Sequence, residues 1–467
     1  MHEENDIGIL GCPQRGIAGG ETCCKPSCIP VYQSGDPSNR FDIVFLAHKY
    51  EDFSKFASDV AKSKDTLLSI EPFKSNADRI NIWLVNENSN LGCWGKWAIR
   101  CDPIRAEEKA YKCPDVDQTV ILTEFGGGSC PGFVAGGTPH VDLAIINARL
   151  PYADRIFVHE LGHCFGGLSD EYVYANTLTT RLYISRGPNC DSNSNCNSWK
   201  EMPNTECIRG CTKPNWYRPT KCSVMSDEIS MDCFYFNSPS ANRLEDRINK
   251  YSHPDQLTGS ASGSKQISLL NFNYNKGLIN MQNISIQRGS ATATVQADAN
   301  YKLNILSASN EILQSLSFEM PTGFAYDYVA DEKLVGDVEE QDNFDFTIAV
   351  PYSASSSKIN VLSNDTELLA TDFSSLAQQG KLYMSTSEGQ KQVSLSTEDV
   401  SKTAGVTAVK DIALNEENAV PVYSVNGTLQ ARLFSIIPVS MDIQTKINAE
   451  NGQVISSAKP WWSFLAS

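Results

Sequence analysis

Two histidines four residues apart carry the clearest chemical signal in the chain. They lie in segment 155–172, which reads Arg-Ile-Phe-Val-His-Glu-Leu-Gly-His-Cys-Phe-Gly-Gly-Leu-Ser-Asp-Glu-Tyr. If this segment is helical, His159 and His163 project from one face, one turn apart, with Glu160 beside them. Two neutral imidazoles can bind Zn²⁺, and the adjacent carboxylate can accept a proton from the water that the ion activates. The pattern therefore predicts a zinc site with Glu160 as general base.

A third protein ligand is expected directly after this helix. Gly166 and Gly167 favour a helix end, because glycine adopts the left-handed conformation without strain, and the chain can then turn back toward the metal. The first candidate position, Ser169, is a poor zinc ligand. We therefore predict Asp170 as the third ligand, with Glu171 as the alternative.

Several motifs in the same order resemble the IgA-peptidase-like zinc metallopeptidases, a secreted, metzincin-related family. The resemblance covers about residues 38–252 and rests on the segment 159–172 and on the runs Asn39–Leu46, Glu71–Ser75, Arg79–Trp83 and Lys221–Met225. It implies a zinc endopeptidase that acts on a protein or peptide substrate. It also implies that Met225 forms the methionine turn beneath the zinc.

One position departs from the pattern that the resemblance implies. Some metzincins have a tyrosine two residues after the turn methionine, where it binds the oxyanion, but this chain has Asp227 there. Tyr172 is a weak candidate for that role, and packing is its more ordinary use. A donor to the transition state other than zinc is therefore unassigned.

Charge and composition exclude some classes of function. The formal net charge of −16 argues against a nucleic-acid partner, because a phosphate-binding surface needs an excess of basic residues. No apolar run is long enough to span a bilayer. The start of the sequence lacks the basic and apolar segments of a signal peptide, so we expect a secreted protein whose signal peptide is absent from this sequence.

The cysteines indicate an oxidising compartment. All 15 lie between positions 12 and 233, which predicts several disulfides. Cys164, inside the expected helix, is predicted to be the unpaired one. Cys12 is either a disulfide partner or a thiolate that masks the zinc. A structural zinc site is an alternative for the cluster Cys23, Cys24 and Cys28.

Hydrophobic periodicity divides the chain into four parts. Residues 1–37 form a Cys/Gly-rich lead-in. Residues 38–256 are predicted to form an α/β domain with a twisted sheet above the active-site helix, and the resemblance implies that it is a metzincin-like catalytic domain. Its strands are expected at 41–47, 80–85, 120–125 and 141–147, and its further helices at 50–70 and 237–250.

The second half is predicted to be non-catalytic. After a Gly/Ser linker at 259–264, alternating segments over 265–375 predict an immunoglobulin-like β-sandwich. Residues 380–467 contain a capped helix start at Ser396–Asp399 among strands and resemble a PepSY domain, which implies a small α+β domain that restrains the peptidase. Near the chain end, Trp461, Trp462 and Phe464 either cover this domain's own core or dock onto another surface.

The predicted fold class is thus α+β/α/β, and the predicted function is that of a secreted zinc-dependent endopeptidase. Two alternatives remain open. One is a non-catalytic extracellular binding or adhesion protein with a zinc-stabilised domain. The other is an amidase acting on cell-wall peptides, which would use the same chemistry in a cleft of different shape.

Overall fold

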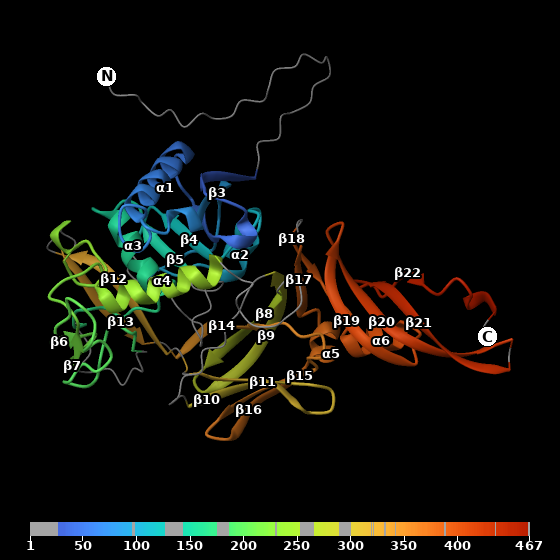
Figure 1. Ribbon diagram of the computed structural model, residues 1–467. Coiled ribbons are helices and arrows are strands. Elements are labelled where there is room, and N and C mark those ends of the chain that lie inside the picture. The colour runs from blue at the N-terminus through green and yellow to red at the C-terminus, as the bar shows by residue number, and fades with distance from the viewer. Residues whose placement is uncertain are drawn as a thin grey trace, which may run out of the picture.

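The computed structural model describes residues 27–95, 99–126, 143–174, 186–228, 231–252, 266–288, 300–318, 320, 322–330, 333–340, 342–386, 389–434 and 436–465. The chain passes through a helix-covered sheet in its first half and through antiparallel sheets in its second half (Figure 1). The expected lead-in cysteines Cys12, Cys23 and Cys24, the linker at 259–264 and an expected strand at 292–295 lie outside the described residues.

A five-stranded sheet forms the centre of the first half. Its strands are β1 (Cys28–Gln33), β2 (Phe41–His48), β3 (Ile80–Ser89), β4 (Gln118–Thr123) and β5 (Ala144–Asn147), in the order β1-β3-β2-β4-β5. Strands β2 to β5 pair in parallel, and β1 is antiparallel to β3. Every residue of β2 is buried, as expected for a central strand covered on both faces.

Helices cover both faces of this sheet. They are α1 (Phe53–Leu67), α2 (Pro103–Ala110), α3 (Ala153–Cys164) and α4 (Ser238–Ser252). Because side chains alternate along a strand, Phe41, Ile43 and Phe45 of β2 share one core with α1, α3 and α4. Val44 and Leu46 point to the opposite face, where they pack with α2. Helix α3, which carries the histidine motif, is therefore anchored beneath the sheet.

Disulfides hold the irregular segment between α3 and α4. This segment includes the hairpin β6 (Ile208–Cys211) and β7 (Lys213–Arg218) and the short helix η3 (Met231–Cys233). The bonds described in this segment are Cys190–Cys211, Cys196–Cys207 and Cys222–Cys233. Cys28–Cys113 and Cys93–Cys101 lie before α3. Cross-links of this kind stabilise loops that have little core of their own, and they indicate an oxidising compartment.

Two cysteine predictions are wrong. Cys164 was expected to be a free thiol, but it is disulfide-bonded. Cys28 was the third member of the alternative zinc cluster, but its sulfur is bonded to Cys113 and cannot bind a metal as a thiolate.

Two sheets share one hydrophobic core in the second half. One has the order β14-β8-β9-β17-β18 and the other β11-β10-β15-β16. Leu270 and Ile284 of the first sheet cluster with Leu303 and Ile359 of the second. The strands are β8 (Gln266–Asn275), β9 (Leu278–Arg288), β10 (Tyr301–Leu306), β11 (Ile312–Phe318), β14 (Asn343–Pro351), β15 (Lys358–Ser363), β16 (Thr366–Asp372), β17 (Leu382–Thr386) and β18 (Gly389–Gln392).

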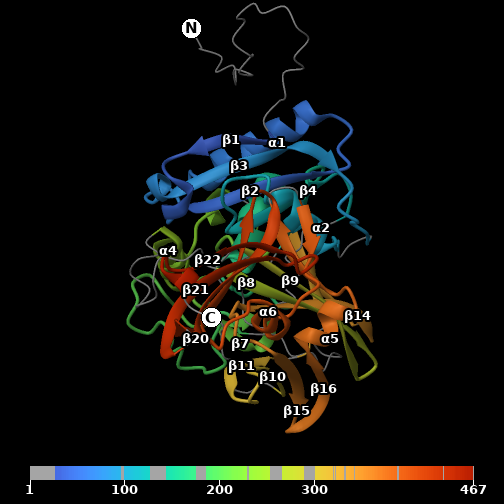
Figure 2. The same cartoon turned by 90° about the vertical axis from the view of Figure 1, so that its right-hand side faces the viewer.

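The C-terminal part is a four-stranded antiparallel sheet. It contains β19 (Ala408–Glu417), β20 (Val420–Leu433), β21 (Ile437–Asn448) and β22 (Val454–Ala458), with the short helices α5 (Phe373–Gln378) and α6 (Thr397–Thr403) and a last turn, η5 (Ser463–Leu465). The capping box predicted at Ser396 and Asp399 is present at α6. Figure 2 shows β20 and β21 as long neighbouring ribbons.

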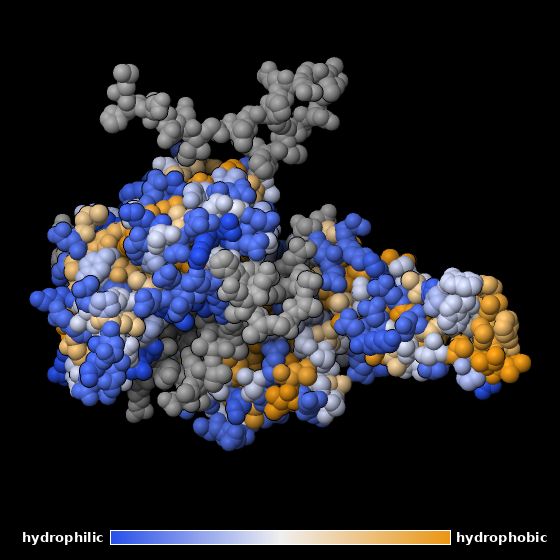
Figure 3. Space-filling view, viewed as in Figure 1, coloured by the Kyte–Doolittle hydropathy of each residue, from blue (hydrophilic) through white to orange (hydrophobic). Residues whose placement is uncertain are grey.

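Apolar residues remain exposed at the end of this sheet. Trp461 and Phe464 are 83% and 75% exposed, so they do not cover the core of their own domain. Phe434 and Ile436, between β20 and β21, are also exposed. Figure 3 shows an orange patch at this end of the molecule.

The predicted fold class is wrong. Among the described residues 43% lie in strands and only 20% in helices, and most of the sheets are antiparallel, which does not fit an α+β/α/β chain with a metzincin-like domain. The prediction gave most weight to the helical motif in the first half. The segments of the second half whose residues alternate with a period of two form long strands, and β20 and β21 alone extend over 14 and 12 residues.

One hairpin leaves the second half and reaches the first. Strands β12 (Gly323–Ala330) and β13 (Lys333–Glu340) pair antiparallel with each other in a sheet of their own. Leu334 of β13 belongs to the core that surrounds α3. Figure 1 accordingly places this hairpin beside α3 and α4, away from the strands β11 and β14 that precede and follow it.

The boundaries predicted between domains stay predictions. Strands β17 and β18 lie on the C-terminal side of the boundary expected at 375–380, and they pair with the sheet on its N-terminal side. None of the helices in the described residues is long and apolar enough to cross a membrane.

Candidate metal centre

Helix α3 positions the two histidines. Its spacing puts His159 and His163 one turn apart, and their ring centroids lie 4.7 Å from each other. The helix ends as the glycine pair predicts: Gly167 has a left-handed φ of 64°, and its N–H donates to the carbonyl of His163 at 2.9 Å. The chain therefore reverses immediately after the second histidine.

Backbone carbonyls fix the orientation of both imidazole rings. Nδ1 of His159 lies 2.7 Å from the carbonyl oxygen of Val224, and Nδ1 of His163 lies 2.7 Å from that of Leu168. Because a carbonyl oxygen only accepts, each Nδ1 must carry the proton. The two Nε2 atoms lie 3.1 Å apart and are left to present their lone pairs to one point.

Asp170 completes a triangle with the two rings. Its Oδ1 lies 3.1 Å from Nε2 of His159 and 3.2 Å from Nε2 of His163. The hydroxyl of Tyr174 donates to its other oxygen, Oδ2. The predicted third ligand thus lies beside both histidines.

Glu171, the alternative ligand, points elsewhere. Its carboxylate accepts hydrogen bonds from Asn189 at 2.9 Å, from Asn237 at 2.6 Å and from the Ser223 hydroxyl at 2.8 Å. These partners lie on loops distant in sequence. Glu171 therefore joins the loops below α3 and does not belong to the histidine cluster.

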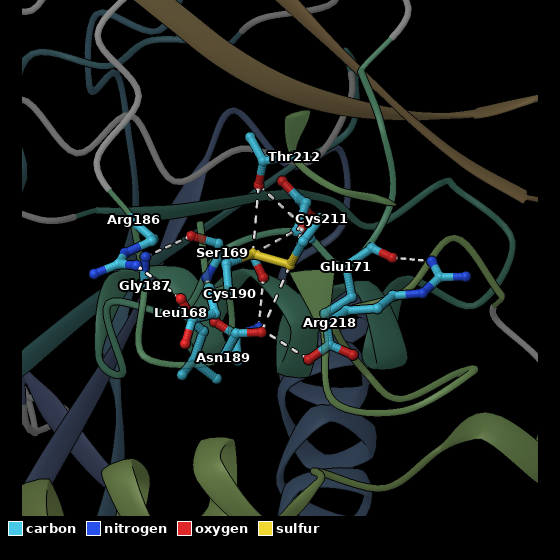
Figure 4. The surroundings of a disulfide bond; sticks show 12 residues. Leu168, Ser169, Glu171, Arg186, Gly187, Asn189, Cys190, Cys211, Thr212 and Arg218 are labelled. Carbon is cyan, nitrogen blue, oxygen red and sulfur yellow. Dashed lines mark hydrogen bonds and ion pairs between the residues drawn. A yellow bond between two sulfur atoms is a disulfide. The ribbon is translucent and has the colours of Figure 1, made fainter. Parts of the chain in front are cut away.

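The loop that carries Asp170 is braced by the Cys190–Cys211 disulfide and its neighbours (Figure 4). The hydroxyl of Thr212 donates to the Asp170 carbonyl at 3.0 Å. Ser169, rejected as a ligand, accepts from the Gly187 N–H at 2.7 Å through its hydroxyl oxygen. The position next to the ligand thus holds the loop in place, which fixes the direction of the Asp170 side chain.

The sequence did not predict a fourth side chain beside the two histidines and Asp170. Asp327 of β12 is 4% exposed, and its Oδ2 lies 3.5 Å from Nε2 of His159 and 3.9 Å from Nε2 of His163. The Tyr172 hydroxyl donates to its Oδ1. Asp327 lies in Tyr-Asp-Tyr within an alternating strand, a pattern typical of any half-buried strand, so no sequence signal marks it.

The spacing of these atoms fits a tetrahedral metal ion. For metal bonds of about 2.0–2.1 Å, tetrahedral ligand atoms are separated by roughly 3.3 Å. The three edges among the histidines and Asp170 are 3.1 to 3.2 Å, and Asp327 is slightly farther away. Ligand atoms of all four residues lie within 4.8 Å of one another. The cluster could therefore hold a metal ion.

The charges of the cluster require a cation or bound protons. Three carboxylates, those of Glu160, Asp170 and Asp327, are buried with two imidazoles. Burial acts to lower the pKa of His163, but the Asp170 carboxylate outweighs it and raises that pKa to about 9. Oδ1 of Asp170 has no hydrogen-bond partner, although two nitrogens lie close to it. An ion at the centre would satisfy this oxygen and both Nε2 lone pairs together.

Glu160 lies beside the cluster without being one of its ligands. It is 1% exposed, and neither of its carboxylate oxygens has a hydrogen-bond partner among the described residues. Burial, followed by the charge of Asp327, raises the pKa of its carboxyl to about 8. A buried carboxyl group with unused lone pairs is suited to exchanging a proton.

Met225 packs directly under α3. It is fully buried, and its carbonyl accepts from the Glu171 N–H at 2.7 Å. A Cβ added at Gly162 would lie only 2.6 Å from the Met225 sulfur, so helix and loop are in close contact between the histidines. The Cys222–Cys233 disulfide closes the loop around this residue.

Tyr172, the weak candidate for a transition-state donor, and Asp227, at the position where some metzincins have that donor, both have partners. The Asp227 carboxylate lies 3.3 Å from the ammonium of Lys333, on the hairpin. The Tyr172 hydroxyl donates to Asp327. The Tyr172 hydroxyl is therefore already used in this arrangement.

Comparison with known proteins adds no assignment: no protein-family model matches the chain, and no curated protein matches it.

Proposed function

We propose that the chain is a secreted zinc-dependent endopeptidase, as the sequence predicts. The observation that carries this proposal is the combination of two Nε2 atoms and one carboxylate oxygen at 3.1 to 3.2 Å with an unpartnered, buried Glu160 at their side. Imidazole and carboxylate ligands in a tetrahedral arrangement suit zinc. The disulfides support export to an oxidising compartment.

The metal would activate the substrate carbonyl and the attacking water. Bound by His159, His163 and Asp170, zinc would polarise the scissile carbonyl and make a water molecule more acidic. The chain's own residues determine how this is used. Hydrogen bonds from Nδ1 to backbone carbonyls hold both rings in the metal-binding tautomer, and Tyr174 orients Asp170.

Glu160 moves the proton. It accepts a proton from the attacking water as the water oxygen bonds to the carbonyl carbon, and it delivers that proton to the amide nitrogen as the C–N bond breaks. The products are a carboxylic acid and an amine, so one water is consumed and no electrons are exchanged. Met225 supports the helix beneath these groups through its contact with Gly162.

A second function has one observation in its favour. Metal sites with four protein ligands are usually structural, and Asp327 would be a fourth ligand here. Such a site suits a binding or adhesion protein with a metal-stabilised domain. An unpartnered buried Glu160 costs stability in a purely structural site, and this favours the endopeptidase.

The test compares Glu160→Gln with the wild type. Both proteins are loaded with zinc, the metal content is measured, and a peptide library is incubated with each with and without a chelator. We expect equal zinc content, cleavage by the wild type that the chelator abolishes, and a loss of at least about 100-fold in the variant. The exposed Glu201→Gln serves as control and should cleave normally. Full activity in Glu160→Gln would show that another group is the base.

A further inference from the structure

The hairpin of β12 and β13 is seated in the metal centre by more than one kind of contact. On the β13 side, the Leu334 N–H donates to the Asp227 carbonyl at 2.9 Å, and Lys333 forms a β-bridge with Glu228. The Lys333 ammonium lies 2.7 Å from the Glu228 carboxylate. The hairpin thus adds to the backbone that follows Met225, directly beneath the histidines.

The β12 side brings a carboxylate to the open corner of the metal site. Asp327 Oδ2 is within 3.5 Å of one Nε2 atom and 3.9 Å of the other, while Oδ1 accepts from Tyr172. In a three-ligand catalytic site this fourth corner belongs to water and then to the substrate carbonyl. The carboxylate of Asp327 and a substrate therefore cannot occupy it together.

Close packing fixes the hairpin at this depth. Asp327 pairs across the hairpin with Gly336, so both lie on the same face. A Cβ added at Gly336 would lie 2.5 Å from two ring atoms of Tyr174 and 2.9 Å from the ring of Tyr172. Both tyrosines are buried. Only glycine lets the hairpin come near enough for Asp327 to reach the centre.

We propose that Asp327 is the fourth protein ligand of the metal and that the hairpin 323–340 closes the site against substrate, so that cleavage by the wild type is slow and is limited by how often this hairpin moves away. The inference rests on the metal centre of the proposed function. It assigns the β-rich second half a role in regulating the first. Moving the hairpin away would free the position that the Asp327 carboxylate holds and would break no covalent bond.

Two variants open the site by different means. Asp327→Ala removes the ligand and keeps the hairpin. Gly336→Ala keeps the ligand and pushes the hairpin off the tyrosine rings. Asp337→Asn is the matched control, because it removes a carboxylate from the same hairpin at a position that pairs with Tyr326, on the opposite face from Asp327.

The first measurement is of the metal alone. Full-length proteins are titrated with Zn²⁺ in competition with a chromophoric chelator, and with Co²⁺ to record the ligand-field spectrum. We expect both opening variants to lose more than about tenfold in affinity, since even residues that only orient a ligand typically contribute that much. Their Co²⁺ spectra should change together, and Asp337→Asn should match the wild type. Unchanged affinity and spectrum in Asp327→Ala would overturn the assignment.

The second measurement is of the hairpin itself. Adding Zn²⁺ to the wild type should slow amide hydrogen exchange in 323–340, and adding it to Asp327→Ala should not. Equal protection in both proteins would overturn the proposed closure. Because this experiment needs no substrate, it does not depend on finding the right peptide.

The third measurement separates this inference from the proposed function. With zinc bound, both opening variants should cleave a peptide library at least about tenfold faster than the wild type, and Glu160→Gln in the Asp327→Ala background should abolish the gain. Equal rates in wild type and opening variants would overturn the closure. If metal affinity falls as expected but no variant cleaves any peptide, Asp327 is a ligand, and the endopeptidase proposal fails instead.

Discussion

The contact between Gly162 and Met225 allows a sharp test of how the metal helix is positioned. Gly162 lies between the two histidines on α3, and a Cβ there would be 2.6 Å from the Met225 sulfur and 3.4 Å from its Cε. Met225 is fully buried, so it has little room to move. We predict that Gly162→Ala forces α3 and the Met225 loop apart.

The expected cost follows from two opposing effects. Overpacking a core by one methyl costs about 1–3 kcal/mol. Alanine in a helix interior is favoured over glycine by about 1 kcal/mol. The net loss of unfolding free energy in Gly162→Ala should then be about 1–2 kcal/mol, since a 2.6 Å approach is at the severe end of overpacking.

The same substitution should have the opposite effect when Met225 is shortened. Met225→Ala alone leaves a cavity and should cost about 2–5 kcal/mol. In that background the clash at Gly162 is gone, and the helix preference for alanine remains. Gly162→Ala should therefore stabilise Met225→Ala by about 1 kcal/mol. The sign reversal is more diagnostic than either single value.

Urea unfolding at one pH measures the unfolding free energy of four metal-free proteins: the wild type, Gly162→Ala, Met225→Ala and the double variant. Gly167→Ala is a suitable control, because its φ of 64° makes alanine costly while no other atom lies near its Cβ. It should cost the same in both backgrounds. If Gly162→Ala also costs the same with and without Met225, then the methionine does not position the helix.

Two further predictions concern side chains around the site and at the contact between the two halves. Tyr174→Phe removes the hydrogen bond to Asp170 and should lower zinc affinity by about 10- to 100-fold in a chelator competition, whereas the exposed Tyr235→Phe should not; equal affinities would contradict an orienting role. Glu107 is buried against Gln287, and burial raises the pKa of its carboxyl from 4.5 to about 8. Between pH 4.5 and 8 the folded state therefore holds a proton on Glu107 that the unfolded state has lost. The free energy of unfolding should fall as the pH rises through this range, by at most about 5 kcal/mol. Glu107→Gln should show a smaller drop in Tm from pH 5 to pH 8, and a drop equal to that of the wild type would contradict the assignment.

The sequence could predict what is decided within a few residues. The spacing of His159 and His163 is a property of one helical turn, and the left-handed glycine that ends the helix follows from the lack of a side chain. The strand at 41–47 and the helix at 50–70 correspond to β2 and α1 within a few residues at their ends. Asp170 was chosen over Glu171 on ligand chemistry and reach, and the structure places Asp170 with the histidines.

The predictions that were wrong depend on contacts between distant parts of the chain, which the local sequence pattern does not encode. The predicted fold class was wrong because the prediction gave more weight to the one helix that carries the histidine motif than to the many strands whose sequence pattern is weak. The free thiol expected at Cys164 was wrong because pairing depends on which chain segments meet, not on the local sequence. Asp327 lies 157 positions after Asp170, on a hairpin whose alternation is ordinary, so only the tertiary structure brings the two together.

If Asp327 is a metal ligand, as we propose, its placement links the second half of the chain to the metal centre. Three buried carboxylates repel one another unless a cation or bound protons neutralise them, so on this proposal a bound metal would draw the hairpin inward and its loss would favour release. The Lys333 pairs with Asp227 and Glu228 are exposed and should add little, which leaves the metal bond and the apolar burial of Leu334 as the main attractions. Closure of this kind would depend on the metal and on no covalent link. A partner that gripped the hairpin could therefore open the site without cutting the chain.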